Sequence, residues 1–238
     1  MKISITLPSV HEEALSQTLD NLEHATTAHE IEVLVVSPFS VKHDCVVWVE
    51  EREATGCVAG HAAAAARATG ELITAWTDDH DYALGWDEKA VENFLDREGK
   101  GPQPFSLGLR QVSATPRVGT VFNVYYPYFP VMRRAAVPAV GGWFDATRYT
   151  HGFSDPDLGL RVWSNGGRCE WADEMTVIPR PENDSRRSPM PDYLDDIAPF
   201  VDRWAPIYGR GHDLSNMRSW NVDRLVSELP EGARTLAP

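Results

Sequence analysis

The sequence predicts an α/β protein whose sheet is doubly wound and mostly parallel. Strand and helix patterns alternate through the first hundred residues, which is typical of this class. The run IEVLVV at 31–36 is continuously apolar, as expected for a strand buried on both faces of a parallel sheet. The 238 residues suit a single domain of this kind, and we expect it to end in a helical tail.

Each element of the first hundred residues is predicted by its own pattern. Ile3, Ile5 and Leu7 alternate with polar residues, and this period of two indicates a strand. Apolar residues three and four positions apart indicate helices at 15–22 and 86–94. The further elements expected here are an alanine-rich helix at 57–68 and strands at 31–36, 45–49 and 71–76.

The second half of the chain gives fewer regular patterns. Residues 99–120 contain glycine and proline without periodicity, so we expect mostly loop there. The later elements expected are a strand-like 122–132 broken by two prolines, a helix from Ser154, a strand at 169–178, a polar loop at 180–192, a helix marked by Tyr193, Ile197, Val201 and Trp204, and a helical end. We expect one domain over 1–189 and a helical extension over 190–238 packed on it.

Charge and cysteine content restrict the classes of function. Lys and Arg number 22 against 35 Asp and Glu, so the net charge is −13 and the positive surface that nucleic-acid binding requires is lacking. Cys45, Cys57 and Cys169 include no CxxC pair, and we expect reduced thiols. No apolar run of about 18 residues and no leader pattern occurs, so we expect a cytoplasmic protein that is not integral to a membrane. The oligomeric state stays open.

Acidic residues follow one of the predicted strands directly. Asp78, Asp79 and Asp81 come just after the strand at 71–76, at the sheet edge where α/β proteins bind ligands. Carboxylates gathered there repel one another, and a divalent cation relieves that repulsion. Magnesium and manganese are usually held by a few such oxygens, with phosphates completing the shell. The alternative is a solvated turn before the helix at 86–94.

A second acidic pair begins a predicted helix. Ser154 followed three residues later by Asp157 matches a capping box, so we expect Asp157 to support the helix start. Asp155 has no such local role, and a carboxylate at this place is a candidate general base for a hydroxyl group. The alternative for Asp155 is a purely structural role at the helix start.

The order of these motifs resembles the family 2 glycosyltransferases, which are inverting enzymes with the GT-A fold. The resemblance covers about 1–180 and rests on Pro8-Ser9-Val10-His11 after the first strand, on GCVAGHAAAAARATGELITAWTDD, and on Trp86. The most specific match is MRRAAVPAVGGWFDATRYTHGFSDPDLGLRVWSNGG at 132–167, because several fixed spacings hold together there.

The resemblance implies roles for five residues. Pro8 and Ser9 would line the pocket for the nucleotide base, and Asp78 would contact the ribose or the metal. Asp79 would hold Mg²⁺ or Mn²⁺ against the donor diphosphate, and Asp155 would take the proton from the acceptor hydroxyl. The donor would be a UDP, GDP or dTDP sugar, and the acceptor a glycan, a lipid-linked molecule or a small molecule.

Departures from the family pattern keep a second class open. Ser37 stands where the family usually has an aspartate, His61 replaces an arginine, and Ser154 replaces a glutamate. The alternative is therefore a degenerate GT-A domain that binds nucleotide or glycan without transfer. A sugar-phosphate nucleotidyltransferase ranks lower, because LPSVHEE after the first strand lacks the glycine-rich basic loop of that class.

Other candidates have a plainer alternative beside each functional hypothesis. Arg186 and Arg187 are candidates for the diphosphate or residues of a solvated loop, and His212 and Asp213 are metal ligands or part of a surface turn. The aromatic residues that stack an acceptor sugar or simply pack the core are Tyr125, Tyr126, Tyr128 and Trp143.

Overall fold

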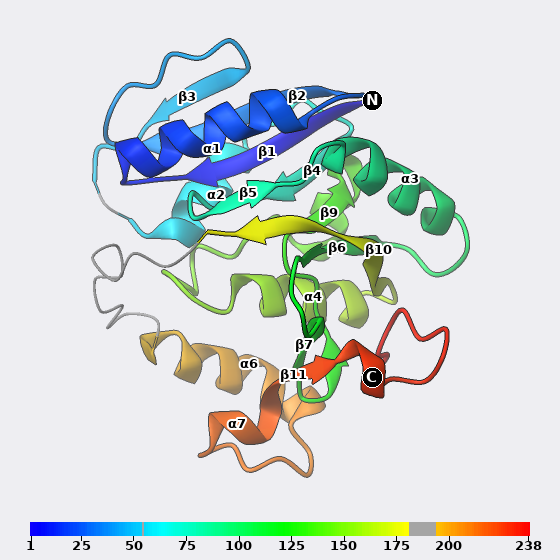
Figure 1. Cartoon of the computed structure of the whole chain (residues 1–238). Helices are drawn as coiled ribbons and strands as arrows, with labels where there is room; N and C mark the ends of the chain where they lie inside the picture. Colours follow the sequence, from blue (N-terminus) through cyan, green and yellow to red (C-terminus); the bar gives the residue numbers. More distant parts are fainter. Residues whose placement is uncertain (54, 181–193) are drawn as a thin grey trace.

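The computed structural model describes residues 1–53, 55–180 and 194–238 (Figure 1). The predicted boundary between 189 and 190, the predicted loop at 180–192 apart from Arg180, and the marker Tyr193 lie outside these residues. The described strands form an eight-stranded sheet in the order β3-β2-β1-β4-β9-β6-β10-β5 and a three-stranded sheet in the order β11-β7-β8.

Most neighbours in the large sheet run parallel, as the sequence predicts. The strands of this sheet are β1 (Lys2–Pro8), β2 (Glu30–Ser37), β3 (Val46–Glu50), β4 (Leu72–Ala75), β5 (His80–Tyr82), β6 (Phe105–Gln111), β9 (Pro130–Arg133) and β10 (Arg168–Pro179). β1 pairs in parallel with β2 and β4, β2 with β3, and β6 with β10. β9 is antiparallel to both β4 and β6, so β6 runs in the same direction as β4. The carboxyl ends of β1, β2, β4, β6 and β10 therefore share one edge of the sheet.

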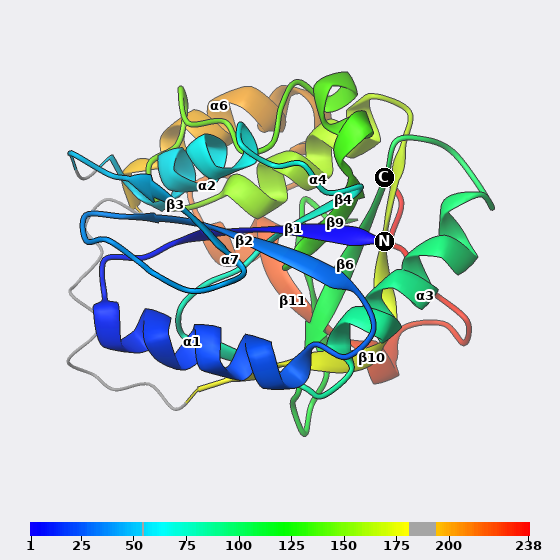
Figure 2. The ribbon, with the colours of Figure 1, turned by 90° about the horizontal axis from the view of Figure 1, so that it is seen from above.

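Helices cover both faces of the large sheet, as Figure 2 shows. α1 (Glu12–Ala25) and α3 (Trp86–Glu98) lie on one face, and α2 (Cys57–Ala65) and α4 (Ser154–Ser164) lie on the other. α6 (Ile197–Tyr208) lies outside α4, followed by α7 (Met217–Trp220), and the short 3₁₀ helices are η1 (Arg134–Val140) and η2 (Val226–Glu228). Among the described helices, none has the length and apolar character needed to cross a bilayer.

The alternation of β1 separates an apolar face from a polar one. Ile3, Ile5 and Leu7 pack in the core beneath α1 and α3. On the opposite face, the Thr6 hydroxyl and His61 Nδ1 of α2 are hydrogen-bonded at 2.8 Å. Burial lowers the pKa of His61 to about 3, so its imidazole is neutral. His61 is thus a core residue of α2.

The prediction of mostly loop over 99–120 is wrong, because this region contains β6 and β7 (Arg117–Val121). The glycines that suggested a loop allow close packing within strands. A Cβ on Gly108 of β6 would collide with the Tyr125 hydroxyl, and one on Gly119 of β7 would lie 2.7 Å from the Tyr126 ring. Glycine is needed there because another side chain approaches the backbone closely.

The C-terminal region is helical only in part. α6 and α7 are helices, whereas Asn221–Leu225 forms β11 and pairs antiparallel with β7. β8 (Val124–Tyr125) completes this small sheet. Phe200, Trp204 and Trp220 pack into the same core as α4, so the C-terminal elements continue the hydrophobic interior of the preceding chain.

Candidate functional site

The first part of the site lies at the carboxyl edge of the sheet, between β1 and β4. Ser9 Oγ, directly after β1, donates a hydrogen bond of 2.5 Å to Asp78 Oδ2, directly after β4. The Ser9 amide donates to the Val36 carbonyl of β2 at 2.9 Å, which fixes this turn. Pro8 packs on α2, where a Cβ on Gly60 would lie 2.6 Å from Pro8 Cβ. The structure therefore brings Ser9 and Asp78, which are 69 positions apart in the sequence, into contact at one edge of the sheet, with Pro8 next to Ser9.

Asp79 is the exposed carboxylate of this edge. It accepts hydrogen bonds from Thr77 Oγ1 at 2.5 Å and from His80 Nδ1 at 2.6 Å. Burial opposes its ionisation, but these two hydrogen bonds outweigh burial and lower the pKa of Asp79 to about 2. Asp81 instead forms an ion pair of 3.1 Å with Arg180. Asp79 is thus ionised at neutral pH, whereas Asp81 already has a cationic partner.

The residues at this edge fit a divalent cation that also binds phosphate. Among the described residues, no group of three His, Cys, Asp or Glu side chains forms a closed metal cage. Mg²⁺ and Mn²⁺ do not require one, since one or two carboxylates and the phosphates of a ligand usually hold them. Asp78 and Asp79 supply such oxygens. His80 is engaged at both nitrogens, because its Nε2 accepts from Gln111 Nε2 at 3.0 Å.

Asp155 lies in the first turn of α4, and burial sets its acidity. Burial raises the pKa of its carboxyl to about 7, although the residue keeps partial contact with solvent. Within the described residues, no hydrogen bond or ion pair engages this carboxylate. Burial and then the charge of Asp155 raise the pKa of Cys57, at the start of α2, to about 11. Asp155 therefore lies beside α2, whose middle packs on Pro8.

The predicted capping box at the start of α4 does not form. The N-cap is Phe153 in the left-handed conformation (φ 58°), and no side chain caps the helix. Asp157 is instead fully buried, with Arg161 Nε donating to it at 2.7 Å. Its other partners are Tyr149 Oη at 3.1 Å, Trp204 Nε1 at 2.9 Å and Arg203 at 3.1 Å. Asp157 thus supports the helix by joining α4 to α6 through buried polar contacts.

A second buried carboxylate fixes the loop that leads to Asp155. Asp196, just before α6, accepts hydrogen bonds from three consecutive backbone amides, those of Thr150, His151 and Gly152, at 2.7–3.1 Å. The Thr150 carbonyl accepts from the Val58 amide of α2 at 3.2 Å. The loop is therefore held from both sides, and α4 begins at a defined place.

Ser37, which stands where the family 2 pattern usually has an aspartate, lies in the interior. Ser37 is fully buried, donates to the Phe39 carbonyl at 2.6 Å and accepts from Trp48 Nε1 at 3.1 Å. The proton of its hydroxyl is already donated and the residue is fully buried, so Ser37 does not face a nucleobase.

Most of the remaining candidate residues have structural roles. His212 belongs to a turn, with Nδ1 bound to the Ser219 carbonyl at 2.8 Å, and Asp213 accepts from Ser215 within the same turn. Tyr125, Tyr126 and Trp143 are buried in the core, as their plainer interpretation holds. Arg186 and Arg187 lie outside the described residues.

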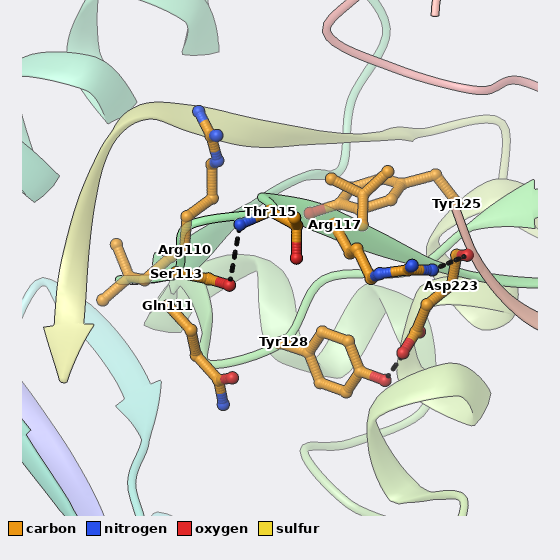
Figure 3. Close-up of a pocket in the computed structure, with 10 residues that line it drawn as sticks. Arg110, Gln111, Ser113, Thr115, Arg117, Tyr125, Tyr128 and Asp223 are labelled. Carbon is orange, nitrogen blue, oxygen red and sulfur yellow. Dashed lines mark hydrogen bonds between the residues drawn. The ribbon is translucent and has the colours of Figure 1, made fainter. Parts of the chain in front are cut away.

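Tyr128 is the exposed member of the aromatic group, and it lines a cavity that sequence reasoning missed (Figure 3). The cavity measures about 310 Å³ and lies beside Gln111, the partner of His80. Its walls come from β6, β7 and β11, and the interpretation of 99–120 as loop and of the tail as helix concealed it. The sequence offered Tyr128 only as one of four aromatic candidates for stacking a sugar, and nothing in it distinguished Tyr128 from the other three.

The eight-stranded sheet, with the Ser9–Asp78 contact and Asp79 at its carboxyl edge, defines an α/β protein with the GT-A fold of glycosyltransferases. No protein-family model matches the sequence, and no curated protein matches it. Solved structures of this fold do match.

Two of these structures come from Staphylococcus aureus TarS. TarS 1–349 superimposes with a TM-score of 0.57 at 15% identity, over 76% of this chain and 60% of that one. TarS 1–349 in complex with UDP-GlcNAc gives 0.59 at 13% identity, over 85% and 67%. GalNAc-T7 with UDP, GalNAc and Mn²⁺ gives 0.63 at 12% identity, over 87% of this chain and 50% of that one. This chain is thus shorter than these proteins and shares their fold.

Proposed function

We propose that this protein is a metal-dependent, inverting glycosyltransferase that moves a sugar from a nucleoside-diphosphate donor to an acceptor hydroxyl. One observation carries the proposal: the Ser9–Asp78 pair and the ionised Asp79 lie at the sheet edge where Pro8 packs on α2, and Asp155, a carboxylate without a described partner, lies beside the start of that helix. A binding pair, a metal ligand and a base are the groups that this reaction requires. The UDP-GlcNAc bound to TarS and the UDP and Mn²⁺ bound to GalNAc-T7 support the same chemistry.

The residues after β1 and β4 would bind the sugar donor. Ser9 and Asp78 would hold the nucleoside, with Pro8 against the base, and Asp79 would provide an oxygen ligand for Mg²⁺ or Mn²⁺. When bound, such an ion neutralises the charge that develops on the departing diphosphate. UDP is the first donor nucleotide to test, since the TarS and GalNAc-T7 structures include complexes with it. GDP and dTDP follow, because Ser37 gives no carboxylate that selects a base.

Asp155 would act on the acceptor. The acceptor oxygen attacks the anomeric carbon while the bond to the diphosphate oxygen breaks, and Asp155 receives the hydroxyl proton. A pKa of about 7 suits this step, because the carboxylate is available at neutral pH and still binds a proton firmly. A single displacement of this kind inverts the anomeric carbon. The buried contacts of Asp157 and Asp196 would hold α4 in place for it.

The proposal also covers the location of the protein, its acceptor and its domain organisation. We infer a cytoplasmic enzyme whose acceptor is a glycan, a lipid-linked molecule or a small molecule. We also infer that 190–238 forms an extension of the domain over 1–189 and packs on it, consistent with the shared core around Phe200.

The first test is thermal stability with UDP, GDP or dTDP, each with and without Mn²⁺. A ligand at about 100 times its Kd adds roughly 2.7 kcal/mol to the stability of the folded state, which is a readily measured shift. We expect one diphosphate to stabilise the protein only when Mn²⁺ is present, and its sugar to be transferred. Binding without any turnover would instead identify the degenerate domain. No stabilisation by any of the three nucleotides contradicts the proposal.

A further inference from the structure

The cavity beside Gln111 is lined by polar groups of three strands and of the segments that connect them. The lining groups that matter here are Gln111, Ser113, Thr115, Arg117, Tyr128 and Asp223, from β6, the following connection, β7, the segment before β9, and β11 (Figure 3). Its volume of about 310 Å³ lies at the lower end of the range of small-molecule sites, roughly 300–1,000 Å³. A cavity of this size suits one sugar ring better than an extended ligand.

The charges of the cavity balance. Arg110 also contributes to the wall, but its guanidinium turns away and donates to the Asp173 carbonyl of β10 at 2.8 Å (Figure 3). Arg117 and Asp223 remain, and Arg117 donates to the Asp223 backbone carbonyl at 3.2 Å. One cation and one carboxylate side by side favour a neutral ligand that both donates and accepts hydrogen bonds. A sugar ring with neighbouring hydroxyl groups has this character.

Tyr128 offers an aromatic surface at the cavity. Its side chain is 37% exposed in a segment whose neighbours are buried. The Tyr126 hydroxyl donates to the Tyr128 hydroxyl at 2.8 Å, the Tyr126 ring meets the Tyr128 ring edge-on at 5.1 Å, and the Tyr128 hydroxyl donates to Asp223 Oδ1 at 3.4 Å. The ring of Tyr128 is therefore held in place by Tyr126 and Asp223. An ordered aromatic ring with a polar tip suits the apolar face and polar rim of a sugar.

The cavity also lies between the two halves of the candidate site. On one side, Gln111 donates to His80, which donates to Asp79. On the other side, the contact between Tyr128 and Tyr126 leads to α4, where a Cβ on Gly159 would lie 2.6 Å from Tyr126 Cβ. A molecule in the cavity is thus bordered by the elements that carry the metal ligand and the base.

We propose that this cavity binds a neutral sugar ring of the acceptor, which stacks on Tyr128 and is hydrogen-bonded by Asp223 and Arg117. The inference rests on the proposed function and assigns its acceptor to carbohydrate. The nucleotide and the acceptor then occupy separate sites, so their binding can be measured separately.

The test is direct binding of simple sugars by saturation-transfer NMR. The probes are the methyl glycosides of glucose, galactose, mannose, N-acetylglucosamine and N-acetylgalactosamine, each with the full chain and without nucleotide. We expect at least one probe to receive saturation from the protein. The variants Tyr128→Ala and Asp223→Ala should lose at least about two thirds of that signal. Tyr128→Phe keeps the ring and should retain most of it, and Asp202→Ala, on an exposed site of α6, should match the wild type.

The outcomes separate this inference from the proposed function. No saturation of any probe by the wild type, or an undiminished signal with Tyr128→Ala, overturns the sugar site. Equal losses in Tyr128→Ala and Tyr128→Phe overturn the stacking role. UDP, GDP and dTDP are measured in parallel by melting temperature. Sugar binding without nucleotide binding leaves the cavity assigned and removes the transferase, whereas nucleotide binding without sugar binding does the reverse.

Discussion

Replacing Asp155 by asparagine should stabilise the protein at alkaline pH while removing its activity. The native carboxyl keeps its proton up to about pH 7, whereas the unfolded chain releases it near pH 3.8. Between these values the native state binds more protons, so the wild type loses stability as the pH rises through this window. Asparagine carries no charge and escapes that loss.

The size of the effect follows from the two pKa values. A pKa difference of one corresponds to about 1.4 kcal/mol, so a rise from 3.8 to about 7 has an upper bound of about 4 kcal/mol. Asp155 keeps partial contact with water, which reduces the effect to about 1–2 kcal/mol. For a chain of 238 residues this is a gain of about 2–8 °C in melting temperature at pH 8.

The assay is a series of melting curves from pH 4 to pH 9 for wild type, Asp155→Asn and the control Asp202→Asn on the exposed surface of α6. The gain of Asp155→Asn should be absent near pH 4 and complete above pH 8, and its transfer rate should fall by about 10²–10⁴. Equal pH profiles for Asp155→Asn and wild type would refute the reasoning, because the carboxyl would then titrate normally.

Three further changes test Asp157, Ser9 and Asp79. Asp157→Ala leaves the buried Arg161 without its carboxylate and should cost about 3–5 kcal/mol, measured by urea unfolding, with a smaller loss for Asp157→Asn. Ser9→Ala removes a hydrogen bond to Asp78 and should weaken UDP binding by about 1 kcal/mol, or roughly fivefold, in calorimetry. An unchanged Kd would exclude this pair from the nucleotide site. Asp79→Asn should abolish the part of the UDP-induced melting shift that depends on Mn²⁺, and a full shift in that variant would place the metal elsewhere.

The sequence predicts the first half of the fold well because its signals are local. Alternation in β1, the apolar run of β2 and the helical spacing of α1 and α3 each need only neighbouring residues. Local patterns do not reveal β6 and β7. Their glycines resemble loop residues until Tyr125 and Tyr126 are seen to press against them from other elements.

In the candidate site too, local sequence predicts some residues, whereas others depend on contacts between distant segments. Asp78 and Asp79 were predictable, since a strand end fixes their place from local sequence alone. Asp157 was predicted to be important for the wrong reason, because its partners Tyr149 and Trp204 come from distant segments. The cavity could not be predicted, since β11 lies about 100 positions beyond β7 in the chain, and only their pairing in the fold forms its wall.

The contact between Gly159 and Tyr126 has a consequence for how this protein could change its substrate. At Gly159 the backbone of the helix that carries Asp155 packs directly on Tyr126 and Pro127, in the segment that carries Tyr128. The distance between the proposed base and the proposed acceptor site is therefore fixed by this close packing, which leaves no room for a side chain at position 159. The protein would gain new acceptors by exchanging side chains in the cavity, such as Ser113 or Thr115. The positions of the reacting groups would not change. The proposed chemistry and the proposed selectivity thus depend on different side chains of one fold.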